Sequence, residues 1–452
     1  MKKKKEQTCV LSADDAVVKE REQKMHNRKF WTIMSIIIAL IVIASFLAGY
    51  FTFKLAQGDK INSIAWLVGE IDKHYLVYDE ETGKVKEFTA EDYADAIKAG
   101  LLDTYSQYYT AEEYSEVVST RQGNNYGLGL SFVSTKGVPK VHSVKGNSPA
   151  YKKGIKSGDL IVAGEVDGVK TAFISYAKMT EFLGERVENE TFVLYITREG
   201  EFEDKVFEVE KKVFVTSFVT YFDSEKTGEF SSESKEKPAF RFIDGGVNKL
   251  DSQTAIIKFD LFEGDASNQL GLALDKMKER GRTKLILDMR NNGGGYMDVL
   301  EGVSALLTYG EKDKTLIARA VYKDQSYSDF YSTGNNFNSQ ITSISVIANE
   351  HTASASECLI GAMLHYKRAF DQTKLVVVND GLSSGGVAKT YGKGIMQTTY
   401  VNGVKGDAVK LTTAYIYQPD TTTCIHGEGI KALAENSFSD NDLALDRAIT
   451  VL

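Results

Sequence analysis

Residues 254–295 read TAIIKFDLFEGDASNQLGLALDKMKERGRTKLILDMRNNGGG, and this stretch decides the fold of the larger part of the chain. Residues 254–259 and 284–289 predict two strands, and residues 268–280 between them predict a helix. The alternation continues with an expected helix near 299–307, a strand at 344–348, a helix at 356–366 and a strand at 375–378. Strand–helix alternation predicts an α/β core, which we place in residues 214–452.

The composition of the chain describes a globular protein of several domains. Its 452 residues provide for about three folded units at roughly 150 residues each. A hydrophobic content of 42% with 26% charged residues argues against a disordered chain. The net charge of −8 disfavours nucleic acid as a partner, since phosphate binding needs a basic face. Three cysteines are too few for a disulfide scaffold.

The N-terminal part of the sequence carries a long apolar run. Residues 30–53 contain no charged side chain, and as a helix they reach about 36 Å, enough for a hydrocarbon core of about 30 Å. We therefore predict a single transmembrane helix there. The preceding tail, residues 1–29, is basic, which predicts a cytoplasmic N-terminus and an extracytoplasmic folded bulk in the cell membrane. A cleaved signal peptide or a buried core helix is the alternative, disfavoured by the length of the run.

Residues 54–122 have apolar residues at helical spacing and predict a helical arm, with a turn at 103–106. We interpret the arm as a helical cap or a homodimer arm, because no catalytic pattern is visible in it. Residues 224–238, rich in serine and charge, predict a solvated insertion. The six histidines and three cysteines form no metal-binding motif, so we expect no metal and no cofactor.

Between the arm and the core, residues 123–213 change to short strands and glycine turns. We expect a short helix at 148–154, a hairpin turn at 166–169 and a helix at 176–183. The run SPA…GI.SGD…DG at 148–168 resembles the bacterial type of PDZ domain. Such domains bind a C-terminal tail by strand addition, with backbone N–H groups receiving the carboxylate. The resemblance makes Tyr126, Gly127, Leu128 and Gly129 the carboxylate loop. The alternative is a β-rich spacer without a ligand.

One nucleophile candidate is the GLSSG run at 381–385, which matches the elbow motif of α/β-hydrolases. Asp420 and His426 follow it in the order of that triad. The elbow requires a helix directly after Ser383, whereas two further glycines follow. We favour a glycine–serine loop and keep a hydrolase acting through Ser383 as an alternative.

The second candidate is Ser354, in the run NEHTASASE at 349–357. Because Ser354 and Glu357 also fit a helix capping box, this segment alone is explained without catalysis. A serine at a helix start nevertheless suits acyl transfer, since the N–H of Ala355 and the positive helix end face a developing oxyanion.

Lys393 lies in the run YGKGIMQ at 391–397. If this run is extended, Lys393 and Gln397 point to one face. A lysine accepts a serine proton only when it is neutral, which requires burial to lower its pKa. Gln397 then holds the amine by a hydrogen bond. Taken alone, a solvent-exposed lysine is the simpler interpretation.

The order of these runs, from NNGGG through NEHTASASE and YGKGIMQ to IHGEGI at 425–430, resembles the carboxyl-terminal processing peptidases, or tail-specific proteases. The resemblance spans residues of about 60–435. It implies a ClpP- or crotonase-like core with an inserted PDZ domain. By resemblance, the nucleophile is Ser354, the base Lys393 and its partner Gln397, and the oxyanion donors are Ala355 and Gly294, with Gly295 as the alternative to Gly294.

Two departures from that family concern the site. His351 stands where the family usually has glycine, and the link 379–390 is longer than usual, which leaves the resting position of Lys393 open. The sequence therefore predicts a membrane-anchored serine endopeptidase that captures protein C-terminal tails through the PDZ domain. The alternative is a catalytically weak or inactive PDZ-containing scaffold that binds exported protein tails. Whether Cys358 and Cys424 pair is left open.

Overall fold

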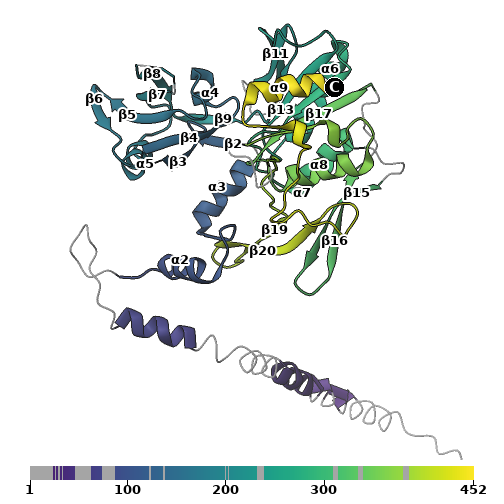
Figure 1. Cartoon of the computed structure of the whole chain (residues 1–452). Coiled ribbons are helices and arrows are strands. Elements are labelled where there is room, and N and C mark those ends of the chain that lie inside the picture. The colour runs from purple at the N-terminus through teal and green to yellow at the C-terminus, as the bar shows by residue number, and fades with distance from the viewer. Residues whose placement is uncertain are drawn as a thin grey trace, which may run out of the picture. The chain divides into compact units, whose positions relative to one another are not determined.

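The structure is a computed structural model whose contacts divide the chain into two units, residues 1–93 and 94–452. The elements are labelled in Figure 1. The described residues are 24–25, 27–28, 31–32, 34–45, 63–73 and 87–452, the last range with gaps at 122–123, 136–137, 199, 202, 232–238, 309–313, 334–339 and 380–385.

The predicted transmembrane helix at 30–53 is wrong for the part of the chain that the structure describes. No helix among the described residues combines the length and the apolar composition that a membrane crossing needs. Residues 46–53 lie outside the described residues. The predicted single-pass localisation, with its cytoplasmic N-terminus, depended on this helix and is corrected with it.

Residues 124–215 form a β-rich lobe. Its six-stranded sheet has the order β3-β4-β5-β7-β8, with β6 paired to β5. Asp167 and Gly168 adopt positive φ values of 50° and 77° and form the predicted hairpin turn between β5 and β6. A separate two-stranded pair, β2 with β9, brings the two ends of the lobe together. The strands are β2 (Asn124–Gly127), β3 (Leu130–Thr135), β4 (Val138–Val144), β5 (Leu160–Val166), β6 (Val169–Ala172), β7 (Thr191–Thr197), β8 (Lys205–Glu210) and β9 (Lys212–Val215).

Two helices complete this lobe, and both were predicted. Helix α4 (Pro149–Lys153) begins at Ser148, whose side chain accepts a hydrogen bond from the N–H of Tyr151 at 3.1 Å. It ends at Gly154, where the φ of 82° favours glycine. Helix α5 (Tyr176–Gly184) buries Met179 and Phe182 against the sheet. Local cap and turn residues therefore account for the secondary structure of this lobe.

The core is an eight-stranded sheet of order β12-β11-β10-β13-β14-β17-β18-β21. Its strands from β13 to β21 run parallel, and the strand–helix alternation predicted for 254–378 is observed. Strands β13, β14, β17 and β18 are buried along almost their whole length, as parallel strands between helices require. The elements are β13 (Thr254–Phe259), α6 (Ala266–Glu279), β14 (Lys284–Asp288), α7 (Met297–Leu307), β17 (Ser343–Asn349), α8 (Ala355–Tyr366), β18 (Leu375–Val378), β21 (Ser437–Phe438) and α9 (Asn441–Thr450).

The antiparallel edge of this sheet corrects the predicted solvated insertion at 224–238. Residues 226–231 form β11 (Lys226–Ser231), between β10 (Val219–Phe222) and β12 (Ala239–Asp244). Phe230 of β11 is 1% exposed, so this segment is a strand packed on the core rather than a solvated insertion. Residues 232–238 lie outside the described residues.

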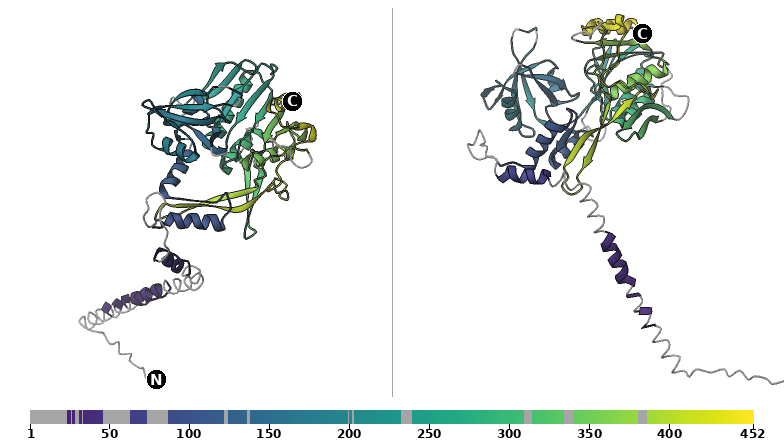
Figure 2. Two further views of the ribbon diagram at one scale, coloured as in Figure 1. Left: turned by 60° about the vertical axis from the view of Figure 1, so that its left-hand side comes forward. Right: turned by 60° about the horizontal axis from the view of Figure 1, so that its bottom comes forward.

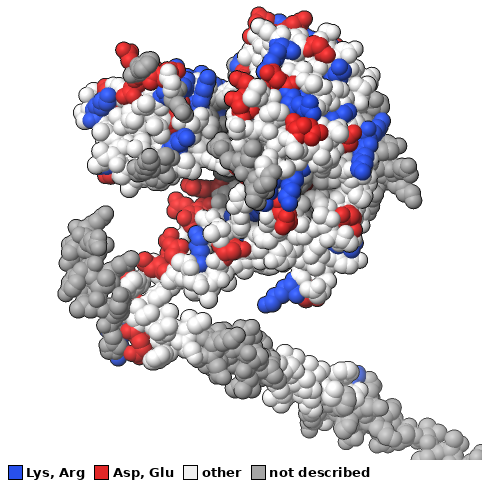
Figure 3. All heavy atoms as spheres, in the orientation of Figure 1, with Lys and Arg blue, Asp and Glu red and all other residues white. Residues whose placement is uncertain are grey.

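A second sheet of five strands has the order β1-β20-β15-β16, with β19 paired to β20. Its long β19–β20 hairpin is yellow-green in Figure 2. Strand β1 joins the arm to this sheet, since Gln107 pairs with Lys410. On the face in Figure 3, side chains of both signs of charge are intermingled. The strands are β1 (Gln107–Tyr109), β15 (Lys314–Tyr322), β16 (Tyr327–Thr333), β19 (Ile395–Val401) and β20 (Ala408–Tyr417), and the arm holds α2 (Ala90–Leu101) and α3 (Ala111–Arg121).

Candidate active site

Ser354 stands at the junction between the buried strand β17 and helix α8. Its backbone has φ 59° and ψ −118°, a left-handed conformation that L-residues rarely adopt. Such a conformation costs about 1–3 kcal/mol and persists only where its surroundings enforce it. Ala355 is the first residue of α8, so its N–H belongs to the unpaired first turn of the helix. The strained serine and the helix N-terminus therefore lie together, as the sequence predicted.

The glycine loop after β14 packs directly against this serine. A Cβ on Gly294 would lie 2.8 Å from both the Ser354 Cβ and the Ala355 nitrogen, so only glycine fits. The fully buried Asn292 fixes the loop: its Oδ1 accepts the N–H of Gly294 at 3.0 Å, and its carbonyl accepts the N–H of Ala353 at 3.0 Å. The N–H of Gly294, the predicted oxyanion donor, thus already donates a hydrogen bond to Asn292 within the same loop.

Glu357 joins the serine segment to the lysine segment. It is fully buried, and its Oε2 accepts the N–H of Ser354 and the N–H of Lys393, each at 2.9 Å. Its Oε1 accepts the Thr390 hydroxyl at 2.5 Å and the Gly392 N–H at 2.7 Å. The backbone nitrogens of Ser354 and Lys393 are therefore no farther apart than the sum of these two 2.9 Å distances. The sequence predicted only the contact with Ser354, since the other partners are distant in the chain.

Burial sets the charge state of Glu357. Burial raises the pKa of this carboxyl, and the four hydrogen bonds it accepts only partly oppose the shift. All four donors are neutral groups, namely three backbone amides and one hydroxyl. Among the described residues, no cationic side chain donates a hydrogen bond to this carboxyl.

Lys393 lies just before β19, beside the serine but not bonded to it. Burial lowers the pKa of its amine and the positive charge of Lys410 lowers it further, whereas Asp103 and Glu357 oppose this shift. Within the described part of the chain, the Lys393 Nζ makes no hydrogen bond with the Ser354 Oγ. The environment therefore shifts the pKa of this amine downward, the direction that the predicted base requires.

Gln397 does not hold this lysine in the structure. Its Nε2 donates to the Thr412 Oγ1 at 3.1 Å. The prediction that Lys393 and Gln397 share one face of a strand is wrong for two reasons. Lys393 precedes β19, and a bulge between Met396 and Gln397 breaks the alternation of side chains.

The arm contributes a residue that the sequence analysis missed. The ring centroid of Tyr105 lies 4.9 Å from the Lys393 Nζ. Tyr105 sits in a turn in which Asp103 Oδ1 accepts the N–H of Tyr105 at 3.1 Å and of Ser106 at 2.8 Å. The predicted turn at 103–106 was the available signal, although it gave no indication of this contact.

The predicted tail-binding loop, Tyr126 to Gly129, connects β2 to β3 in the β-rich lobe. A Cβ on Gly129, at φ 73°, would lie 2.2 Å from the Ser148 Cβ, so glycine is required there. Beside the loop is a groove of about 370 Å³. The groove is lined largely by the loop, by β3 and by α5; its lining includes Tyr126, Leu128, Gly129, Leu130, Phe132, Lys145, Thr180, Leu183, Phe192 and Phe214.

The remaining candidates do not assemble. Ser383 lies outside the described residues. Asp420 accepts hydrogen bonds within its own turn, from the Thr423 hydroxyl at 2.6 Å and from two backbone amides. In the described ranges it has no hydrogen bond with His426. Cys358 and Cys424 are free thiols.

Comparison with known proteins identifies relatives of this chain. A family model described as "Peptidase family S41" matches residues 253–432. A probable CtpA-like serine protease of Staphylococcus epidermidis is 25% identical over 415 residues, covering 89% of this chain and 72% of that protein. A probable CtpA-like serine protease of Staphylococcus aureus is 27% identical over 416 residues, covering 90% and 73%.

Among solved structures, the photosystem II D1 C-terminal processing protease is similar over 85% of this chain and 89% of its own chain. The TM-score is 0.47 and the sequence identity 20%.

Proposed function

The chain is a member of peptidase family S41, of the CtpA-like serine proteases, and from this premise we propose that it cuts proteins with a Ser354–Lys393 dyad after capturing their C-terminal tails. The tail-binding element in this proposal is the groove beside Tyr126–Gly129. The proposal requires no cofactor.

The observation that carries the dyad is the shared acceptor Glu357 Oε2. Two segments that are 39 positions apart in the chain (393 − 354) donate to the same oxygen at 2.9 Å each. This arrangement gives the buried Glu357 a role in fixing two backbone segments, since its donors there are backbone N–H groups. The strained φ of 59° at Ser354 supports the same interpretation, since strain of this kind concentrates at functional sites.

In the proposed reaction the Ser354 hydroxyl attacks the peptide carbonyl while the neutral Lys393 amine accepts its proton. Proton transfer needs a hydrogen bond between the two groups, so the lysine side chain turns towards Ser354 when substrate is bound. The N–H of Ala355 and the positive end of α8 stabilise the oxyanion, with Gly294 or Gly295 as the second donor. The Lys393 ammonium protonates the leaving amine, and the same residue then activates water to hydrolyse the acyl-enzyme.

For tail capture, the groove offers a β3 edge, a short glycine-containing loop and an apolar lining. An extended tail adding to β3 would place an apolar last side chain among residues such as Phe132 and Phe192. Lys145 in the same lining supplies a positive charge near the carboxylate end. We therefore expect tails that end in a free carboxylate and a large apolar residue.

The test compares Ser354→Ala and Lys393→Ala with the parent on an unfolded protein that has an apolar C-terminus. Both variants are expected to lose at least about 10⁴-fold in kcat/KM while keeping the parent's circular dichroism spectrum. Ser383→Ala is the control and should retain full activity. Full activity in either dyad variant contradicts the mechanism, and tail binding without turnover by the parent indicates a scaffold.

Capture is tested separately by amidating the C-terminus of the same substrate. Loss of the carboxylate should raise KM about tenfold or more with little change in kcat, because the reacting groups are untouched. Equal kinetics for the free and amidated substrates would contradict tail capture and leave the dyad intact.

A further inference from the structure

An aromatic ring of the arm covers the amine of the proposed base. The Lys393 Nζ lies over the ring of Tyr105, 4.9 Å from its centroid, within the range of a cation–π interaction. Tyr105 lies outside residues 253–432, the part matched by the family model. The contact therefore connects the arm to the reactive group of the peptidase core.

The surroundings of Tyr105 hold this ring in place. Its hydroxyl donates to the hydroxyl of Tyr391 at 3.0 Å. Tyr391 lies two residues before Lys393 in the chain. On the other side, the Ser106 hydroxyl accepts the N–H of Thr412 at 3.3 Å, and β1 pairs with β20 directly after it. A ring anchored at both ends provides a fixed binding face, whereas a freely rotating surface tyrosine does not.

We propose that Tyr105 is a positioning residue that holds the ammonium form of Lys393 on its ring face until substrate arrives. It acts through the lysine and does not touch the scissile bond. Displacement of the amine from the ring then accompanies its turn towards Ser354, so that the base becomes available as the site fills. This inference rests on the proposed dyad, because it concerns the residue assigned as its base.

The charged groups around the amine determine what removal of the ring would do. Lys410 on β20 and burial disfavour the ammonium, while Asp103 in the arm turn and Glu357 on α8 favour it. The face of an aromatic ring also favours the ammonium form, because its quadrupole attracts a cation. Replacing the ring with an aliphatic side chain keeps the cover and removes the attraction, so the neutral amine should form at a lower pH.

The experiment measures the pH at which Lys393 becomes reactive, in a Ser354→Ala background that does not require catalysis. The probe is reductive methylation of Lys393 with formaldehyde and a borohydride reagent, quantified by mass spectrometry from pH 5 to 10. Tyr105→Leu should move the midpoint down by about one pH unit relative to the background protein. Tyr105→Phe keeps the ring face and should leave the midpoint within about 0.3 units.

Tyr400→Leu is the matched control, because Tyr400 is an exposed tyrosine on β19 and should not change the midpoint. Thermal unfolding of each variant confirms that the fold is retained. An unchanged or higher midpoint in Tyr105→Leu, or equal shifts in the Leu and Phe variants, overturns the proposal.

The same substitutions in the active enzyme separate this inference from the proposed dyad. The acid limb of the kcat/KM profile should move to lower pH in Tyr105→Leu by the same amount as the labelling midpoint. Full activity in Lys393→Ala would remove the dyad, whatever the labelling result. If Tyr105→Leu shifts the labelling midpoint of Lys393 but leaves the acid limb of the kcat/KM profile in place, Tyr105 is not coupled to catalysis.

Discussion

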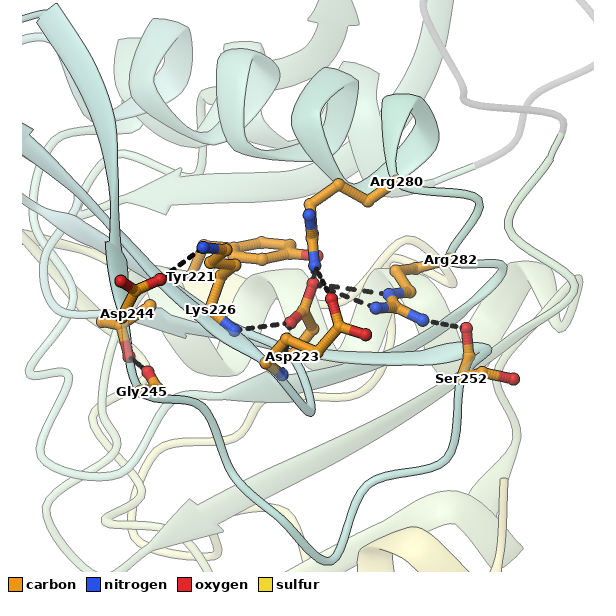
Figure 4. A network of polar contacts seen from close by, with 10 residues as sticks. Tyr221, Asp223, Lys226, Asp244, Gly245, Ser252, Arg280 and Arg282 are labelled. Carbon is orange, nitrogen blue, oxygen red and sulfur yellow. Dashed lines mark hydrogen bonds and ion pairs between the residues drawn. The ribbon is translucent and has the colours of Figure 1, made fainter.

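Two fully buried carboxylates of this protein have opposite surroundings. Asp223 and Glu357 are each 0% exposed. Arg280 and Arg282 converge on Asp223 in Figure 4, whereas the donors to Glu357 within the described part of the chain are all neutral. The first arrangement compensates a charge, and the second uses a carboxylate to fix backbone positions.

Asp223 joins the turn between β10 and β11 to the segment between α6 and β14. Its Oδ1 accepts the N–H groups of Glu225 and Lys226 at 2.8 Å, and its Oδ2 accepts the Tyr221 hydroxyl at 2.9 Å together with the arginines. Burial alone would raise the pKa of Asp223, but these hydrogen bonds outweigh it and hold the pKa below its usual range.

The opposite pKa shift at Glu357 is caused by burial, which the hydrogen bonds from neutral donors only partly oppose. A buried carboxylate without a positive partner is costly, and this protein tolerates it at the junction of the serine and lysine segments. The comparison teaches that burial alone does not distinguish a structural from a functional acid. Asp223 and Glu357 differ in the charge of the donors that bind them.

The largest effect on stability is expected for Asp223→Ala, which leaves Arg282, 7% exposed in its side chain, without its carboxylate. Breaking a buried ion pair costs about 3–5 kcal/mol, so urea unfolding should show a loss of that size. The kcat/KM of the folded fraction should stay within about twofold.

Asp244→Ala is the matched control for Asp223→Ala. Asp244 pairs with Lys226 but its side chain is 93% exposed, so its removal should leave stability nearly unchanged. Equal losses of stability in the two variants would mean that the ion pairs between Asp223 and its buried arginines contribute nothing to the stability of the fold.

Glu357→Gln is expected to lower kcat/KM by about 100-fold with a smaller loss of stability. The amide oxygen can keep the N–H groups of Ser354 and Lys393. Its NH₂ then faces the Thr390 hydroxyl, which can turn to accept, and the Gly392 N–H, which cannot. The lysine segment therefore shifts relative to the nucleophile, and single-turnover kinetics measure the result.

The charge of Glu357 gives a second readout for the same variant. Since that charge favours the Lys393 ammonium, the acid limb of the pH profile should also move to lower pH. Glu428→Gln is the control, because Glu428 pairs with Lys431 at the surface, 71% exposed. A Glu357→Gln variant with normal kcat/KM would reduce this residue to a helix cap.

The elements that the sequence predicted correctly depend on local signals. Ser148 and Gly154 lie at the ends of one short helix, and the core strands follow from apolar runs that need no knowledge of distant residues. Strand β11 was missed because the charged and serine-rich composition of residues 224–238 outweighed the single large apolar residue Phe230 in the strand. The transmembrane prediction rested on the composition of residues 30–53 alone, and no helix among the described residues is long and apolar enough to cross a membrane.

The contacts of the candidate site also divide into local ones, which the sequence predicted, and distant ones, which it did not. Ser354 and Glu357 were found together because a capping box spans three positions. The contacts of Glu357 with Lys393 and of Lys393 with Tyr105 span 36 and 288 positions (393 − 357 and 393 − 105). Only the pairing of β1 with β20 and the packing around α8 bring these residues together, and neither leaves a periodic signal in the sequence.

The pH dependence of stability should have opposite signs at the two acids. The pKa of Asp223 is lowered by folding, so its contribution is present above its unfolded pKa of about 3.9 and is lost as the pH falls. The pKa of Glu357 is raised, so its contribution is present below about 4.3 and is lost as the pH rises through the folded pKa.

Urea unfolding of the parent, Asp223→Asn and Glu357→Gln between pH 3.5 and 7 measures both contributions. The stability advantage of the parent over Asp223→Asn should shrink towards low pH, and that over Glu357→Gln should grow. Parallel trends for the two variants would contradict the contrast between a compensated and an uncompensated carboxylate.

The smallest effect is expected for Thr390→Val, which removes one donor from Glu357 at nearly constant volume. Thr390 is 1% exposed, and its hydroxyl also accepts the N–H of Ile430 at 2.8 Å, so the loss of stability should be about 1–2 kcal/mol. The kcat/KM should fall only about threefold to tenfold, because Oε2 still holds both Ser354 and Lys393. A loss of activity as large as that of Glu357→Gln would locate the function of this acid in Oε1 and the Thr390–Gly392 segment, and the shared acceptor would no longer explain how serine and lysine are held together.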